Sequence, residues 1–242
     1  MPEIPAEEIE EAVRLAWDEL AKTREAMWEK GQETLKWLKD NHRHGFVLAG
    51  RPYHVDSEIN HGIPELINSY GVAVLTEDSI SNLNEPERPL IVMDQWMYHS
   101  RLYAAANYVK TTENLDLIQL NSFGCGLDAV TTDQVKDILA NSGKIYTCLK
   151  IDEISNLGAA RIRVRSLLAA IRAREEKKEE RKIVPASFNR VVFTEKMRKD
   201  YTILCPQMTP IHFDLLETAF NAFGYRLAVL TRVERVAVNL GL

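Results

Sequence analysis

Short apolar runs of the chain are followed by polar residues and glycines that could bind a ligand or do chemistry. The first run leads into Arg51, the second into Asp78, the third into a Gly-Cys-Gly sequence around Cys125 and the fourth into Glu153. If these runs are parallel strands, their carboxyl ends share one edge of a sheet, where ligands bind. The candidate binding residues at this edge are Arg51, Tyr53, His54, Asn60, His61, Asp78, Ser122, Gly124, Gly126 and Glu153, with Cys125 as the candidate metal ligand.

Cys125 lies between two glycines, just ahead of a helix predicted to begin near Asp128. Glycines permit positive φ angles and close backbone approach, and amides at a helix N-terminus favour a thiolate. Three roles are open for Cys125: a metal or cluster ligand, a nucleophile, or a small buried residue in a tight turn. Cys148 and Cys205 fall in or at the end of predicted strands, where we expect core positions.

Arg51, Tyr53 and His54 place a cation, a phenol and an imidazole on the first loop. This combination suits a polar or anionic ligand, and it suits a capped surface turn equally well. His54 and His61 have no metal-binding partner at helical spacing and no nearby cysteine, so we do not expect them to bind a metal. The sequence has no Walker A loop, no GxGxxG and no GxSxG, which removes the commonest nucleotide and hydrolase signatures but leaves nucleotide binding open.

The segments that must position these loops alternate between strand and helix patterns. Strands are predicted at 46–49, 72–75, 115–120 and 145–149, and helices at about 62–70, 89–110, 128–142 and 157–176. Such alternation favours right-handed crossovers and a parallel sheet covered on both faces. We therefore expect a Rossmann-like three-layer α/β domain with a mainly parallel sheet.

Two further segments flank this domain. Apolar residues at helical spacing over 6–41 predict a long amphipathic helix, or a helix pair broken near Gly31. After Pro185, strands at 190–194, 201–205 and 226–230 and a helix at about 210–223 look like the opening of a second α/β unit. We expect a helical segment at 1–44, the Rossmann-like domain at 45–185 and the start of a second unit at 186–242, which could pack on the first. The chain would then be a piece of a longer protein.

Composition excludes several classes of protein. With 242 residues, 45% of them hydrophobic, the chain can bury a core without metal or disulfide staples. A net charge of -5 argues against a general nucleic-acid binder. Apolar runs are far shorter than the roughly 18 to 20 residues of a membrane span, and the acidic N-terminus is unlike a signal peptide. Three widely spaced cysteines predict neither a disulfide framework nor a self-contained zinc site. We expect a cytoplasmic protein.

Three long blocks of the sequence carry a resemblance to a known family. They are GRPYHVDSEINHGIPELINSYGVAVLTEDS, LIQLNSFGCGLDAVTTDQV and LKIDEISNLGAARIRVRSLLAAI. These blocks resemble the large activator proteins of 2-hydroxyglutaryl-CoA dehydratase, the CoA-substrate-specific enzyme activases. Within those proteins the similarity is to the portion that is related to the 2-hydroxyacyl-CoA dehydratase subunits. It extends from about residue 6 to the end of the chain.

The resemblance implies a particular cofactor. In that family, cysteines from different segments hold an iron-sulfur cluster between Rossmann-like subdomains, and an ATP-hydrolysing activator with an actin-like fold supplies a low-potential electron. Cys125 matches a cysteine that would ligate such a cluster. A four-iron cluster normally needs about four thiolates, so the ligand set of this chain would be incomplete. The phosphate-binding signature of the activator itself is absent, so ATP would act only through another domain or partner.

The resemblance favours a domain associated with an iron-sulfur cluster and with low-potential electron transfer to acyl-CoA-type chemistry in an anaerobic system. The alternative is a non-catalytic scaffold, or an α/β domain that binds a small anion or CoA. Whether the protein is an enzyme is left open, and we expect this piece alone to be inactive. The expected partners are other domains of the parent protein, a dehydratase-like partner, an acyl-CoA and a second copy of the chain, with no nucleic acid and no membrane.

Overall fold

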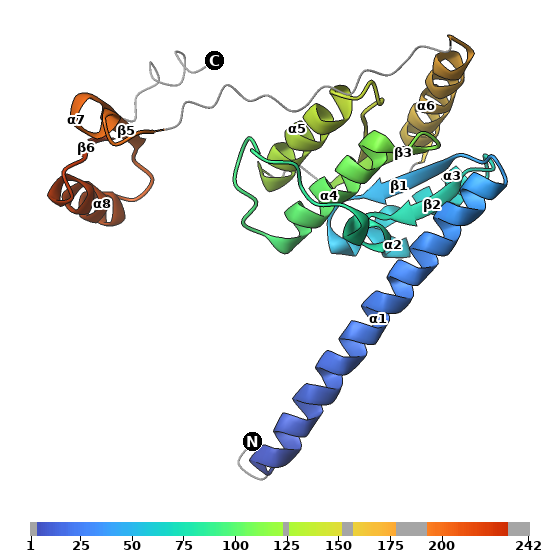
Figure 1. The fold of residues 1–242 in the computed structure, drawn as a ribbon, viewed down its shortest axis with the longest axis horizontal. Helices are drawn as coiled ribbons and strands as arrows, with labels where there is room; N and C mark the ends of the chain where they lie inside the picture. The colour runs from blue at the N-terminus through green and yellow to red at the C-terminus, as the bar shows by residue number, and fades with distance from the viewer. Residues whose placement is uncertain (1–3, 123–125, 152–156, 178–192, 232–242) are drawn as a thin grey trace. The chain divides into compact units, whose positions relative to one another are not determined.

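The computed structural model describes residues 4–122, 126–151, 157–177 and 193–231 (Figure 1). It divides the chain into two compact units, residues 1–188 and residues 189–242. The elements of the first unit are α1 (Ala6–Asp40), β1 (Gly45–Ala49), η1 (Pro52–Val55), α2 (Ser57–Asn60), α3 (Ile63–Asn68), β2 (Ala73–Thr76), η2 (Glu77–Ser79), η3 (Ser81–Leu83), α4 (Met97–Thr111), β3 (Leu115–Ser122), α5 (Gly126–Ala140), β4 (Thr147–Ile151) and α6 (Gly158–Lys177).

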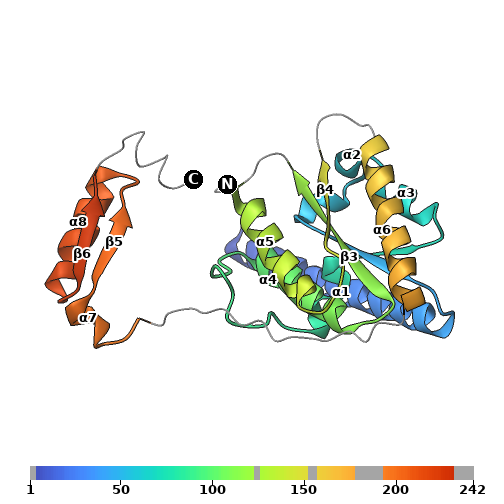
Figure 2. The same ribbon diagram turned by 90° about the horizontal axis from the view of Figure 1, so that it is seen from above.

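The four strands of the first unit form one parallel sheet in the order β2-β1-β3-β4. Alternate side chains of each strand enter different cores, because successive residues of a strand point to opposite faces. Val47 and Leu117 pack with residues of α1, α4 and α5. Phe46 and Ile118 pack on the other face with residues of α3 and α6, so helices cover both faces of the sheet (Figure 2). The predicted Rossmann-like α/β fold with a parallel sheet is confirmed.

The N-terminal segment is one continuous helix, so Gly31 does not break it. Gly31 serves packing instead. A Cβ at this position would lie 2.1 Å from the carbonyl oxygen of Ser79, so only glycine lets η2 lie against the helix. Leu38, about two turns further along the helix, is fully buried in the core. The C-terminal half of α1 is therefore part of the α/β domain.

One helix begins later than its sequence pattern predicts. The prediction was a helix over 89–110, whereas α4 begins at Met97. The segment before Met97 forms its hydrogen bonds without being helical. Asp94 accepts hydrogen bonds from Arg88 and Ser100, and the backbone N–H of Ile91 donates to Gln134 of α5. These contacts with other parts of the chain replace the hydrogen bonds that a helix would have supplied.

The second unit contains α7 (Met197–Asp200), β5 (Thr202–Pro206), α8 (Pro210–Ala222) and β6 (Arg226–Leu230). Its two strands pair in parallel, and α8 contacts β6. The strand predicted at 190–194 falls largely outside the described residues. Across the described part of the chain, no helix combines the length and the apolar character needed to cross a membrane.

Candidate functional site

The strand order reverses between β1 and β3. From β1 the chain passes to β2 on one side, and β3 then pairs with the other side of β1. In parallel α/β sheets, ligands bind at the carboxyl ends of the two strands that flank such a reversal. Here these ends carry Gly50, Arg51 and η1 after β1, and Ser122 and α5 after β3. We call this region the carboxyl edge.

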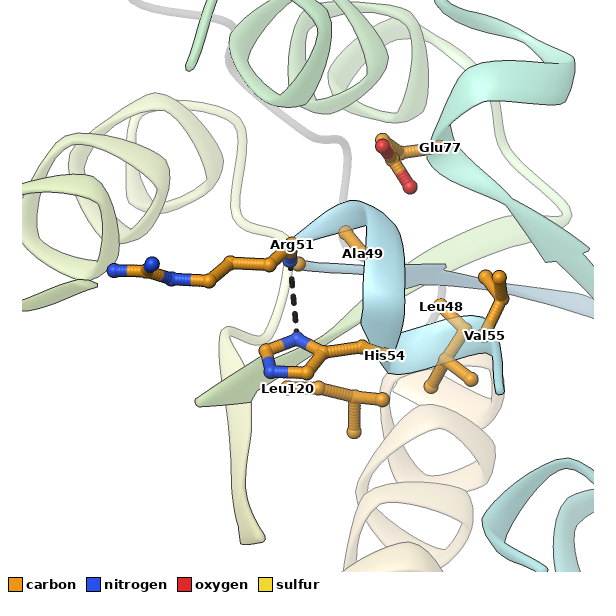
Figure 3. A pocket seen from close by; sticks show the side chains of 8 residues that line it. Leu48, Ala49, Arg51, His54, Val55, Glu77 and Leu120 are labelled. Atoms are coloured by element: carbon orange, nitrogen blue, oxygen red, sulfur yellow. Dashed lines mark hydrogen bonds between the residues drawn. The ribbon is translucent and has the colours of Figure 1, made fainter. Parts of the chain in front are cut away.

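His54 links the two strand ends of the carboxyl edge. Its Nδ1 accepts a hydrogen bond from the backbone N–H of Arg51 at 3.0 Å (Figure 3). Its Nε2 lies 2.5 Å from the hydroxyl oxygen of Ser122. Because Nδ1 is an acceptor, the neutral ring carries its proton on Nε2 and donates it to Ser122. The imidazole thus fixes the first loop to the end of β3.

The protonation of His54 excludes one chemical role. Burial lowers the pKa of His54 to about 4; the charge of Arg51 adds to this effect and that of Asp128 opposes it. The ring is therefore neutral at pH 7, with its Nε2 proton already directed at Ser122. A general base needs an unprotonated nitrogen facing the hydroxyl that it activates. In this arrangement, His54 and Ser122 do not form a nucleophile-and-base pair.

Arg51 is the cation of the carboxyl edge. Its Nε donates to Asp128 at 2.8 Å, and Asp128 also accepts from the backbone N–H of Ser122 at 3.4 Å. The guanidinium carbon lies 6.0 Å from the ring centroid of Tyr53 and 5.7 Å from that of Tyr98, within cation-π range. Burial lowers the pKa of Arg51, but the hydrogen bond and charge of Asp128 raise it overall. Arg51 is thus a permanently charged group held between two aromatic rings.

Glu77 is a buried carboxyl group that lines the same hollow as Arg51 and His54, and the Arg51 side chain runs away from it (Figure 3). Burial, followed by the charge of Asp78, raises the pKa of Glu77 from 4.5 to about 7, although Arg101 opposes the shift. The nearest guanidinium nitrogen of Arg101 is 3.4 Å away, which is a long contact for an ion pair. Glu77 therefore exchanges its proton near neutral pH.

A small hollow opens at the carboxyl edge. Its lining residues are Leu48, Ala49, Gly50, Arg51, His54, Val55, Glu77 and Leu120. The empty space is about 160 Å³ including open solvent, whereas sites for whole small molecules measure roughly 300–1,000 Å³. None of this space is large enough to enclose a water molecule, so the hollow is a shallow depression in the surface.

Aromatic side chains border the carboxyl edge at the start of α4. Trp96 is 52% exposed, and its ring lies 6.1 Å from that of Tyr98, which in turn faces Arg51. The ring of buried His99 lies 4.3 Å from that of Tyr98. The Nε2 atom of His99 has no hydrogen-bond partner among the described residues. We call Trp96, Tyr98 and His99 the aromatic rim.

The structure brings together several of the predicted site residues. Arg51, His54 and Ser122 are directly connected, and the Tyr53 ring packs edge-on against His54 at 4.8 Å. Asn60 is buried and donates to the carbonyl oxygen of His54 at 3.3 Å, so it supports the loop.

Other predicted residues have different positions. His61 has a φ of 54° at the end of α2, and Asp78 accepts a hydrogen bond from Thr76 at the end of β2. Gly126 begins α5, and a Cβ there would meet nothing within 4 Å. The predicted residues Gly124, Cys125 and Glu153 lie outside the described residues.

Sequence reasoning missed four residues of the site. Asp128 could have been found as the acidic residue of a first helical turn after a glycine-containing loop. Glu77 adjoins the predicted Asp78 at the same strand end. Nothing in the sequence indicated that Tyr98 and His99 belong to the site, because the pattern placed them inside a longer helix. Their position at the true start of α4 brings them to the carboxyl edge.

The described residues do not form a site for an iron-sulfur cluster. Within the described ranges there is no group of three or more His, Cys, Asp or Glu side chains placed to hold a metal ion. Burial raises the pKa of the Cys148 thiol, which disfavours the thiolate that a cluster needs. Cys205 belongs to the second unit. Among the described residues, Cys148 is therefore not placed to act as a cluster ligand.

Comparison with known proteins gives one match. Residues 2–80 match the family model of the CoA enzyme activase uncharacterised domain. The matched segment contains α1, β1, the loop with Arg51 and His54, and β2. No curated protein and no solved structure matches the chain. Over this N-terminal segment, the chain is similar to the uncharacterised domain of CoA enzyme activases.

Proposed function

We propose that the carboxyl edge binds an acyl-CoA-type ligand through one of its anionic groups, as part of a dehydratase-activator system. Arg51 carries the proposal. It is the charged donor at the strand-order reversal, and it lies in the segment that matches the CoA enzyme activase domain. A guanidinium offers N–H donors in a planar fork that suits phosphate and carboxylate groups, and the Nε of Arg51 donates to Asp128.

The size of the hollow determines how such a ligand would lie. The hollow is too shallow to enclose a group of the ligand, so the ligand would lie across the surface with an anionic group at Arg51. The rest of the ligand would lie over the aromatic rim, where Trp96 is exposed and can stack with the adenine ring of CoA. The Nε2 of His99 is buried beneath this rim and has no hydrogen-bond partner among the described residues.

The geometry supports binding rather than catalysis by these residues. His54 is neutral and directs its Nε2 proton at Ser122, so it is a positioning residue for the loop that carries Arg51. Asp128 is occupied by Arg51 and by the backbone of Ser122. The edge therefore holds a ligand, and the chemical step would come from another domain or protein.

Calorimetry with the full chain tests this proposal. We expect CoA to bind, free phosphate to bind more weakly and adenosine to bind weakest. Arg51→Lys retains the charge but loses the planar fork, so the Kd for CoA should rise by about 10- to 100-fold. Arg161→Lys makes the same change on an exposed position of α6 and should leave the Kd unchanged. Equal affinities of the two variants, or no binding of CoA, would contradict the proposal.

A second candidate function concerns Cys125. Ser122 ends β3 and Gly126 begins α5, so the segment with Cys125 is bordered on both sides by residues of the carboxyl edge. Cys125 would then contribute one thiolate to an iron-sulfur cluster that is shared with another domain or chain, in support of low-potential electron transfer. Anaerobic reconstitution of the full-length parent protein tests this role. A Cys125→Ser variant with unchanged iron content and spectrum would exclude it.

A further inference from the structure

We propose that the outer side of α6 binds an acidic helix of a partner protein. The carrying observation is a row of three arginines along this helix. Arg161, Arg165 and Arg172 are exposed, and none of their side chains forms an ion pair or a hydrogen bond with the described residues. At about 100° per residue they lie within about 40° of one another, spaced about 6 Å and about 10 Å along the helix axis. We call these three residues the arginine row.

The other sides of α6 are occupied by its own unit. One side packs into the core on one face of the sheet (Figure 2). Arg163 donates a hydrogen bond to the carbonyl oxygen of Cys148 in β4 at 3.4 Å. Arg174 donates to Asp116 at 3.0 Å. Two arginines of α6 therefore bind the sheet, whereas the three of the arginine row face away from it.

The arginine row differs from the solvated surface of α1. On that helix, Arg14 forms ion pairs with Glu11 and with Asp18 at 3.0 Å, so acids and bases alternate and compensate one another. Residues 158–174 of α6 contain five arginines and no acidic residue. Like charges four residues apart destabilise a helix, as in the arginine row. Carboxylates supplied by a partner would remove this repulsion.

The surface beside the arginine row suits another helix. Ser166, Ala169 and Ala173 are exposed there, together with Ile162, which is 68% exposed. Small side chains let a second helix approach to the roughly 8–10 Å that separates the axes of packed helices. Ile162 adds an apolar contact to this surface. An α-helix is therefore the shape that the outer side of α6 can accept.

The charge of the arginine row determines the chemistry of the partner helix. A guanidinium binds a carboxylate through two parallel hydrogen bonds, so glutamates or aspartates at positions i, i+4 and i+11 would match the row. A membrane surface is disfavoured, because Ile162 is the one large apolar side chain on this side of α6. The net charge of -5 disfavours a nucleic acid. An acidic protein helix fits both the charge and the shape.

Peptide binding to the full chain tests the proposal. The probe is a synthetic helical peptide of about 20 residues, roughly 30 Å long, with glutamates at i, i+4 and i+11 beside a face of alanines. In the control peptide, glutamine replaces each glutamate. Fluorescence anisotropy should show binding of the glutamate peptide alone, with a Kd that rises with salt concentration. Equal binding of both peptides, or no binding of either, would overturn the proposal.

Substitutions on α6 test where the peptide binds. Arg165→Glu reverses the middle charge of the arginine row and should raise the Kd about three- to tenfold. Arg163→Glu is the matched control, since it makes the same charge change about 160° away and should alter the Kd less than about twofold. Circular dichroism checks that both variants keep their helix. Equal effects of the two substitutions would exclude the arginine row as the site.

Two further probes distinguish the source of the negative charge. Phosphatidylserine vesicles and a single-stranded RNA are tested against wild type and Arg165→Glu. We expect neither probe to bind as tightly as the glutamate peptide. Tighter binding of vesicles or RNA that Arg165→Glu weakens would contradict an acidic helix and identify a membrane or a nucleic acid as the partner.

Discussion

Buried charged groups have different partners at the two ends of the same parallel sheet. At the amino ends of β1 and β3, the fully buried Asp116 lies 3.0 Å from both His44 and Arg174 and 4.0 Å from Lys144. We call these four residues the amino edge. Burial raises the pKa of Asp116, but His44, Lys144 and Arg174 outweigh burial and lower it overall. Several cations thus surround one carboxylate.

The carboxyl edge is not balanced in this way. Glu77 has a raised pKa, His54 has a lowered pKa, and Arg51 contacts Asp128 at 2.8 Å. Titratable groups with shifted pKa values are found more often at functional sites than elsewhere in a fold. The comparison teaches that several cations compensate the buried carboxylate of the amino edge, whereas the carboxyl edge contains a carboxyl group and an imidazole with shifted pKa values, which supports the proposed ligand site there.

The largest expected effect is at the amino edge. Asp116→Ala leaves three positively charged or titratable groups around an empty position, so we expect the free energy of unfolding to fall by about 3–5 kcal/mol. Urea denaturation measures this change. A loss of stability below about 1 kcal/mol would show that the amino edge contributes little to the stability of the sheet.

The next effect is at the carboxyl edge. A Cβ on Gly50 would lie 2.3 Å from Nδ1 of His54 and 3.0 Å from the carbonyl oxygen of Leu120. Gly50→Ala should therefore displace His54 and lower the free energy of unfolding by about 1–3 kcal/mol. CoA affinity should fall together with stability, since the loop of Arg51 moves. Retained affinity and stability would mean that this loop is not a fixed part of the site.

The raised pKa of Glu77 predicts that the free energy of unfolding depends on pH. Below pH 4.5 the carboxyl group is neutral in both states and has no effect. Between 4.5 and about 7 the unfolded chain loses the proton first, so the free energy of unfolding should fall by about 1 kcal/mol for each pH unit and then level off. Glu77→Gln should lack this fall, as denaturation at a series of pH values would show. Identical profiles of variant and wild type would contradict the assignment.

The smallest expected effect is spectroscopic. The folded-state pKa of His54, about 4, lies below its ordinary value of 6.5. The unfolded chain therefore takes up the proton first as the pH falls, and the contribution of His54 to stability is lost between pH 6.5 and about 4. An NMR titration of the imidazole should show a neutral ring down to about pH 5. Protonation near pH 6.5 would refute the neutral hydrogen bond to Ser122.

The sheet could be predicted from the sequence because each strand is indicated by a short run of neighbouring apolar residues. The apolar runs around Val47 and Leu117 and the helices between them determine a parallel α/β fold, and the loop with Arg51 and His54 was placed at the correct edge. The start of α4 was wrong, because the tertiary contacts of Asp94 and Ile91 decide it.

Side-chain environments were harder to predict than elements. Asp116 stands in an apolar run, and nothing in its neighbours indicates that His44 and Arg174 reach it from distant segments. The burial of Glu77 depends likewise on α4 and on the loop after β1. The partners of a buried charge are determined by the fold as a whole, so a single sequence does not reveal them.

Chemical-shift mapping of the full chain during titration with CoA tests the central claim most directly. The two edges belong to the same sheet, so the amino edge serves as an internal control. The account predicts that the backbone amides of Arg51, His54 and Ser122 shift with increasing CoA, while those of His44, Asp116 and Lys144 do not. Shifts confined to the amino edge, or no shifts at either edge, would contradict it.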